Sequence, residues 1–186
     1  NFLQVAGTST GEAYVLGTEY RYSDSTLHTV LWKYNNVAEL DYSVSLTSGA
    51  IADTPGHDRA LALEVAPDGN LLTLMRHSVA SMPSNLTTTG TEFVYVLSKI
   101  DQSNGSVIWN EVINPYTDAQ WQTVDPNSDY LNSKWVGLLA DMVVDSTGAA
   151  YVAWGTTGAS GWVKYDTTGS SPTLVGSYDR VADTTG

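Results

Sequence analysis

The stretch Val143–Gly155, VVDSTGAAYVAWG, decides the fold. It places a polar Asp-Ser-Thr-Gly turn before a short run of small, β-branched and aromatic residues, which is typical of a β-hairpin. The run is too short to span a membrane. Elsewhere, no window of about 12 residues has the apolar spacing of an amphipathic helix, whereas short strand-like runs recur. The sequence therefore predicts an all-β protein.

The same hairpin pattern occurs three times along the 186 residues, as VAGTSTGEAYVLG, VAPDGNLLTLM and the opening stretch. The turn glycines of the three copies are Gly11, Gly69 and Gly148. Farther along each unit, a strand ends in a lysine followed by a turn, in LWKYNN, LSKIDQSNG and WVKYDTTG. The three lysines are Lys33, Lys99 and Lys164, which are 66 and 65 residues apart (99−33 and 164−99). These spacings indicate an internal repeat.

Two kinds of connection alternate within each unit. The turns after the first and third strands are tight, whereas the connections after the second and fourth strands vary in length. This pattern predicts about three four-stranded antiparallel β-propeller blades, at residues 1–50, 51–114 and 136–186, with a long connection at 115–135. Propellers typically use 4 to 8 blades, so we expect the whole chain, 1–186, to be a single segment of a larger propeller. Self-association of such chains into a six-blade ring is the competing hypothesis.

Motifs within these units resemble those of a bacterial-type β-propeller repeat family. Blades of that family read Tyr-Val-x-Gly and then Lys-x-Asp-x-x-Gly-x-x-x-Trp, which YVLGT, YVAWG and KIDQSNGSVIWN resemble. The segment around Trp109 is also similar to the tryptophan-docking blades of quinone-dependent dehydrogenases, and GHDRALALEVAPDG is similar to a WD-type blade. One unit of three carries that tryptophan, so no quinone cofactor is implied. The resemblance covers nearly the full chain and implies a propeller architecture.

The amino-acid composition indicates which binding partners are disfavoured and where the protein is expected to be located. Twenty acidic and eight basic residues give a net charge of −12, which disfavours nucleic acid and anionic membrane surfaces as partners. The absence of cysteine excludes disulfides and thiolate chemistry. No apolar run approaches 18 residues, so membrane insertion is not expected. The sequons at Asn85 and Asn104, with the polar, β-rich composition, favour a secreted or cell-surface protein.

Candidate catalytic residues do not form a recognisable constellation. The stretch GTSTG, Gly7–Gly11, has the letters of a Gly-x-Ser-x-Gly nucleophile motif, but a strand and not a helix is expected after it. Ser9 is therefore interpreted as a turn residue. The three histidines are far apart and lack metal-ligand spacing. The sequence assigns no catalytic residue and leaves open whether the protein is an enzyme, with the balance against it.

One acidic segment has the oxygen-rich pattern that calcium prefers. Asp125, Asn127 and Asp129 supply oxygen side chains at alternate positions. Tyr130 and Val136 stand where an EF-hand loop needs glycine and glutamate, which excludes that motif. A loop-bound calcium ion and a solvated acidic turn both remain open, and no other cofactor is expected.

Aromatic residues concentrate in the connections of variable length, which a propeller places at one end of its blades. Exposed aromatic side chains there would anchor a protein or glycan. Packing of the same side chains onto the blades is the alternative. The candidate ligand-binding residues are Tyr20, Tyr22, Tyr116, Trp121, Tyr130 and Trp135. By contrast, Trp109, Trp154 and Trp162 lie within strands and are expected in the core.

The leading functional hypothesis is a non-catalytic propeller module of a secreted or cell-surface protein that binds a protein or glycan through its loop-rich end. One alternative is a structural assembly subunit that pairs through open blade edges, so that further blades come from the same precursor or from neighbouring chains. Another is part of a propeller enzyme, a hydrolase or quinone-dependent dehydrogenase, whose catalytic residues lie elsewhere.

Overall fold

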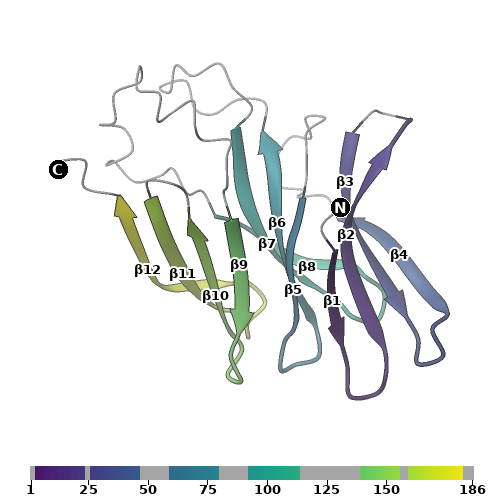
Figure 1. The fold of residues 1–186 in the computed structure, drawn as a ribbon. Helices are drawn as coiled ribbons and strands as arrows, with labels where there is room; N and C mark the ends of the chain where they lie inside the picture. The colour runs from purple at the N-terminus through teal and green to yellow at the C-terminus, as the bar shows by residue number, and fades with distance from the viewer. Residues whose placement is uncertain are drawn as a thin grey trace.

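The structure, a computed structural model, describes residues 3–23, 26–46, 59–79, 92–113, 139–155 and 159–181. These residues form three four-stranded antiparallel sheets in which strand order follows the chain (Figure 1). The first sheet contains β1 (Leu3–Gly7), β2 (Ala13–Arg21), β3 (Thr26–Tyr34) and β4 (Leu40–Leu46). The second contains β5 (Arg59–Val65), β6 (Leu71–Val79), β7 (Glu92–Ile100) and β8 (Val107–Ile113). The third contains β9 (Leu139–Val144), β10 (Ala149–Gly155), β11 (Ala159–Asp166) and β12 (Thr173–Val181).

The all-β prediction is confirmed, and within the described ranges the structure has no helix that could cross a membrane. The three sheets occupy successive segments of the chain, residues 3–46, 59–113 and 139–181, and tight turns join the first strand to the second and the third to the fourth in each. These turns gather at the lower end of the sheets in Figure 1. The long connection expected at 115–135 lies outside the described residues.

The first turn of every sheet has the same geometry. Its glycine donates a backbone hydrogen bond to the carbonyl three residues earlier and adopts a positive φ. The pairs are Gly11 to Thr8 (3.1 Å, φ 87°), Gly69 to Ala66 (2.9 Å, φ 87°) and Gly148 to Asp145 (3.0 Å, φ 85°). Glycine adopts this left-handed conformation without a steric penalty, which explains its place in all three turns.

Strand pairing also follows one register in the three sheets. The lysine of each third strand lies opposite the same position of the second strand. The pairs are Lys33 with Tyr14, Lys99 with Leu72 and Lys164 with Tyr151. A shift of register towards the fourth strand follows directly after each lysine. Such an irregularity bends and twists the strand, so the three sheets curve at the same place.

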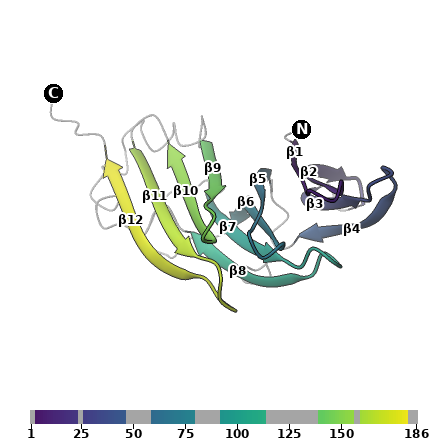
Figure 2. The ribbon, with the colours of Figure 1, turned by 90° about the horizontal axis from the view of Figure 1, so that it is seen from below.

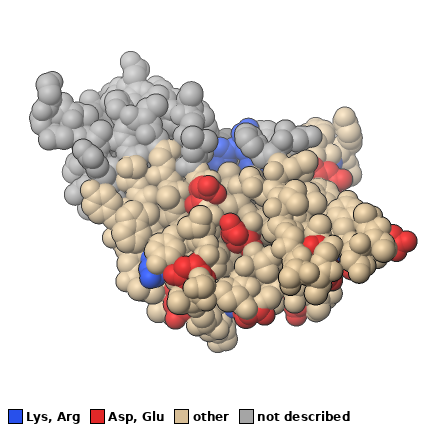
Figure 3. Space-filling model, turned by 60° about the horizontal axis from the view of Figure 1, so that its bottom comes forward, with Lys and Arg blue, Asp and Glu red and all other residues tan. Residues whose placement is uncertain are grey.

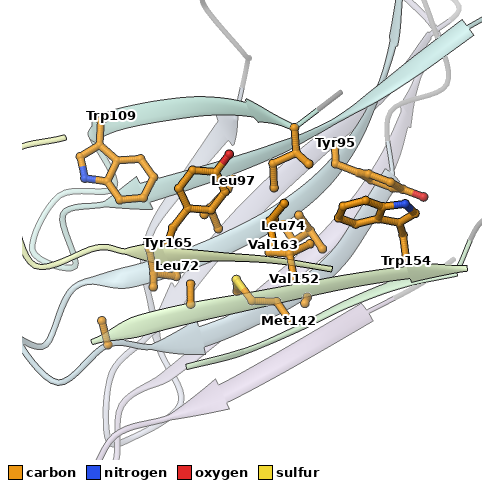
Figure 4. Close-up of a cluster of buried hydrophobic side chains, with 14 residues drawn as sticks. Leu72, Leu74, Tyr95, Leu97, Trp109, Met142, Val152, Trp154, Val163 and Tyr165 are labelled. Carbon is orange, nitrogen blue, oxygen red and sulfur yellow. The ribbon is translucent and has the colours of Figure 1, made fainter. Parts of the chain in front are cut away.

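The second sheet lies between the other two, and β5 contacts both β1 and β9 (Figure 2). One core cluster joins the first and second sheets and includes Tyr14, Leu31 and Met75. The other joins the second and third sheets, where Trp109, Tyr165 and their neighbours pack between the facing strands (Figure 4). The sheets are therefore held together face to face by side chains.

The two central strands of the middle sheet, β6 and β7, are buried on both faces, in agreement with their nearly continuous apolar sequence, whereas the edge strand β8 is partly exposed. Among the described residues, the first and third sheets are each covered on one face. Trp109 and Trp154 are 8% and 7% exposed, as expected for core residues, but the expectation for Trp162 is wrong because this side chain is 41% exposed. Side chains alternate across a strand, and the neighbours of Trp162 in β11 point into the core, so its ring lies on the outer face.

Candidate functional site

Two of the predicted ligand-binding residues, Tyr20 and Tyr22, form an exposed aromatic pair where β2 ends. Their rings are 5.0 Å apart between centroids and meet edge to face at 88°. Tyr20 is 47% exposed and Tyr22 is 89% exposed. The alternative interpretation, in which these rings pack onto the sheet, does not hold for this pair.

The local sequence explains how the pair is presented. Tyr20 is one of the last residues of β2, and Tyr22 follows the strand directly. Residues two apart in an extended chain point to the same side, which brings the two rings together. Glu19 precedes the two tyrosines and Arg21 lies between them in the sequence. These two side chains form an exposed ion pair, with Arg21 Nε 3.4 Å from Glu19 Oε2. The rings thus offer an apolar surface with hydroxyl tips beside a weakly charged edge.

The other predicted site residues lie outside the described residues. They are the four aromatics Tyr116, Trp121, Tyr130 and Trp135 and the candidate calcium ligands Asp125, Asn127 and Asp129. Among the described residues, no group of three or more His, Asp or Glu side chains could hold a metal ion. Ser9 lies in the turn between β1 and β2, so a strand follows it and the nucleophile geometry is absent.

The tight-turn end of the molecule is rich in acidic side chains. Asp and Glu are scattered across this face and few Lys or Arg side chains accompany them (Figure 3). Several of these carboxylates are held by their own turns. Asp145 Oδ1 accepts hydrogen bonds from the Thr147 hydroxyl (2.6 Å), the Thr147 amide (2.9 Å) and the Ala149 amide (3.0 Å). These bonds, led by the one from the Thr147 hydroxyl, lower the pKa of Asp145 from 3.8 to about 2.

Asp101 follows the same pattern in the turn between β7 and β8. Its Oδ1 accepts from the Ser103 hydroxyl at 2.6 Å and from the Ser103 amide at 2.8 Å. The Ser103 hydroxyl, followed by the amide, lowers the pKa of Asp101. Asp101 and Asp145 therefore stabilise hairpin turns, and this role accounts for their positions without a ligand.

Polar contacts join the first and second sheets to the turn between the third and fourth strands of the sheet that follows each of them. The Tyr42 hydroxyl of the first sheet donates to the Gln102 carbonyl at 3.1 Å, and the Tyr14 hydroxyl donates to Gln102 Oε1 at 3.3 Å. In the second sheet, Lys99 Nζ donates to the Thr167 carbonyl at 2.7 Å. Lys99 is 3% exposed, and Asp68 Oδ2, 2.7 Å away, balances its charge.

Exposed apolar side chains on the outer faces of the first and third sheets were not identified from the sequence. On the first sheet these include Leu3 (60% exposed) and Val5 (66%). On the third sheet, Val143 (58%) and Tyr178 (53%) accompany Trp162. The alternation of side chains along each strand assigns these residues to one face of their sheet. Where both faces are apolar, alternation does not show which face another sheet covers.

The sequence matches no known family profile and no curated protein. Its fold is similar to that of an exotype rhamnogalacturonan lyase, YesX, with a TM-score of 0.57, 11% identity and coverage of 96% of this chain and 33% of that one. A second rhamnogalacturonan lyase, YesW, gives a TM-score of 0.52 at 11% identity, covering 96% of this chain and 34% of that one. The chain thus spans about a third of the length of these proteins. At this identity the likeness concerns the fold alone.

Proposed function

We propose that the chain is a non-catalytic module of a secreted or cell-surface protein that binds a carbohydrate through the end of the sheets bearing Tyr20 and Tyr22. The exposed edge-to-face pair of rings carries this proposal. Aromatic rings stack against the C–H faces of sugars, and the phenol hydroxyls supply hydrogen bonds that orient them. Asn104, in an exposed sequon between β7 and β8, supports an extracellular location.

We interpret the three sheets as consecutive blades of a larger β-propeller. Their shared registers, their face-to-face packing and the contacts of β5 with β1 and β9 support this interpretation. In such a fold, the connection after β2 opens at the same end as the connections between blades. The Tyr20–Tyr22 pair would then belong to a wider binding surface at that end.

A carbohydrate is favoured over a protein because the similar YesX and YesW structures are, by their names, rhamnogalacturonan lyases. The net charge of −12 opposes binding of polyanions, and Glu19 lies beside the pair. We therefore expect a neutral polysaccharide to be bound more tightly than a uronate-rich one.

Affinity electrophoresis and calorimetry with a panel of neutral and uronate-rich plant polysaccharides test the proposal. The unchanged chain is expected to bind a neutral polymer, and Tyr20→Ala with Tyr22→Ala is expected to weaken binding at least tenfold. The matched variant, Tyr20→Phe with Tyr22→Phe, keeps both rings and is expected to retain most of the affinity. Equal binding by the alanine variant, with an unchanged circular dichroism spectrum, would overturn the proposal.

A second candidate function is suggested by the names of the similar structures: the chain would be part of a carbohydrate lyase whose catalytic residues lie elsewhere. Incubation of the chain with rhamnogalacturonan, followed by detection of unsaturated uronate products, distinguishes the two. Product formation would establish an enzyme and contradict the non-catalytic proposal. Binding of a neutral polymer without such products would support the binding module.

A further inference from the structure

The outer faces of the first and third sheets are not equivalent to each other. In the middle sheet, one face packs on the first sheet and carries Leu71 and Met75, while the opposite face packs on the third sheet and carries Leu72 and Leu74. We call the face that a sheet turns towards the next sheet along the chain its forward face, and the face that it turns towards the preceding sheet its rear face. In each interface, the forward face of the earlier sheet therefore packs on the rear face of the later one.

The strand registers assign the two exposed faces to these classes. The second-strand residue opposite the lysine lies on the forward face in the first two sheets, as Tyr14 and Leu72. Its equivalent in the third sheet, Tyr151, shares the outer face with Trp162 and Tyr178. The outer face of the third sheet is thus an uncovered forward face among the described residues. By the same registers, the outer face of the first sheet, with Val5 and Val15, is an uncovered rear face.

Both links between sheets end on a carbonyl of the turn between the third and fourth strands of the later sheet, but their donors differ: Tyr42 in the first sheet and Lys99 in the second. Lys33 of the first sheet instead pairs with Glu12 and Asp41 of its own sheet. The exposed faces carry a lysine and a turn of the kind that the second and third sheets join.

Thr167 and Gln102, whose carbonyls accept from the preceding sheet, each lie three residues after the lysine of their own sheet (167−164 and 102−99). Asn36 has this position in the first sheet (36−33), in an exposed turn. On the forward face of the third sheet, Lys164 is half-buried, with Nζ 4.8 Å from the centre of the Tyr151 ring. It stands where Lys99 stands in the second sheet.

We propose that a second copy of this chain docks here, so that the rear face of its first sheet packs on the forward face of the third sheet. This interface continues the two interfaces already present within the chain. Lys164 of one copy then donates to the main chain of the turn at Asn36 of the other. The two faces differ, so the contact is head to tail, and two copies that close on each other satisfy both exposed faces. The proposal goes beyond carbohydrate binding and does not involve Tyr20 or Tyr22.

A second copy is favoured because this chain carries both halves of the interface, apolar surface and polar link alike. The forward face offers Trp162, Tyr178 and Val143, and the rear face offers Leu3 and Val5. Exposed apolar side chains gathered on one face mark interaction surfaces. The same pairing of faces is buried twice inside the molecule, with closely packed aromatic and aliphatic residues.

Light scattering and sedimentation velocity over a range of concentrations test the proposal with the full chain. A species of twice the 20.0 kDa chain mass is expected. Trp162→Glu on the forward face and Val5→Glu on the rear face are each expected to abolish it, because each buries a charge in both contacts. Lys164→Met removes one charged hydrogen bond per contact, and its apparent dissociation constant is expected to rise about tenfold or more. A chain that stays monomeric at all concentrations would overturn the proposal.

Mixing the two glutamate variants distinguishes head-to-tail docking from other forms of association. In the mixture, the intact forward face of one variant can pack on the intact rear face of the other, while the second contact carries both glutamates and stays open. The mixture is therefore expected to regain a dimer through the single intact contact, weaker than that of the unchanged chain, which neither variant forms alone. Val107→Glu, on the edge strand β8 away from both faces, is the matched control and is expected to leave the dimer unchanged. Failure of the mixture to associate, or loss of the dimer in the Val107 variant, would contradict the proposal. Circular dichroism verifies the fold of each variant.

Discussion

A single carboxylate, Asp145, holds the turn of the opening hairpin. In the folded chain the pKa of Asp145 falls from 3.8 to about 2, because the Thr147 hydroxyl and the amides of Ala149 and Thr147 donate to it. A carboxyl group whose pKa is lower in the folded chain than in the unfolded chain stabilises the fold at pH values above its unfolded-chain pKa. This stabilisation is lost as the pH falls through the folded-chain pKa. We therefore expect Asp145 to stabilise the protein above about pH 4 and to lose this effect towards pH 2. Asp145→Asn is expected to lower stability near neutrality and to flatten the acid limb of the unfolding curve.

Denaturant unfolding from pH 2 to pH 7 measures this effect. Ser146→Ala, an exposed change in the same turn, is the matched control and should leave the acid limb unchanged. If Asp145→Asn and the unchanged chain show the same pH dependence, the carboxylate does not stabilise the turn in the way its hydrogen bonds indicate.

At the scale of an element, the turn between β7 and β8 lies tightly against β4 of the preceding sheet. Gly105 has a φ of 75°, and a Cβ placed there would lie 2.8 Å from Tyr42 Cε2 and 2.9 Å from Val44 Cγ2. An alanine would meet both a left-handed backbone and a filled space. Gly105→Ala is therefore expected to lower the free energy of unfolding by about 2–4 kcal/mol, measured by urea denaturation.

Gly155 provides the control for that substitution. An added Cβ at Gly155 meets no atom within 4 Å, and the residue ends a strand of the third sheet. Gly155→Ala is expected to change the free energy of unfolding by less than about 1 kcal/mol. Equal losses at the two positions would show that the close approach of the β7–β8 turn to β4 is not what restricts Gly105.

Hairpins and strands could be predicted from the sequence because their causes are local. A glycine that needs a positive φ, a polar turn and alternating side chains all lie within a few residues, as in Val143–Gly155. The exposure of Trp162 could not be predicted in this way. Alternation shows that Trp162 and Val163 point to opposite faces, but which face is covered depends on another sheet, distant in the sequence.

The same limit applies to the candidate site. Tyr20 and Tyr22 were identified because the sequence predicted a connection there. In the structure, Tyr20 lies in β2 and Tyr22 follows that strand, and both side chains are exposed. The contact of Lys99 with the Thr167 carbonyl was not identified, although the lysine was part of the observed period. It joins residues 68 positions apart (167−99), and a single sequence gives no pairing information over that distance.

At the scale of the whole molecule, the three sheets should differ in local stability. The central strands of the second sheet, β6 and β7, are covered on both faces, whereas the first and third sheets are each covered on one face by the described chain. Local opening costs most where apolar burial is greatest. Hydrogen exchange, followed by NMR or mass spectrometry in dilute protein where no second copy is bound, is expected to be slowest for β6 and β7 and faster for β1 and β12. Val5→Glu, which is expected to keep the protein monomeric, should preserve this order. If β1 or β12 exchanges as slowly as β6 and β7 under these conditions, burial on two faces does not set the order of opening, and the middle sheet is not the most stable part of the fold.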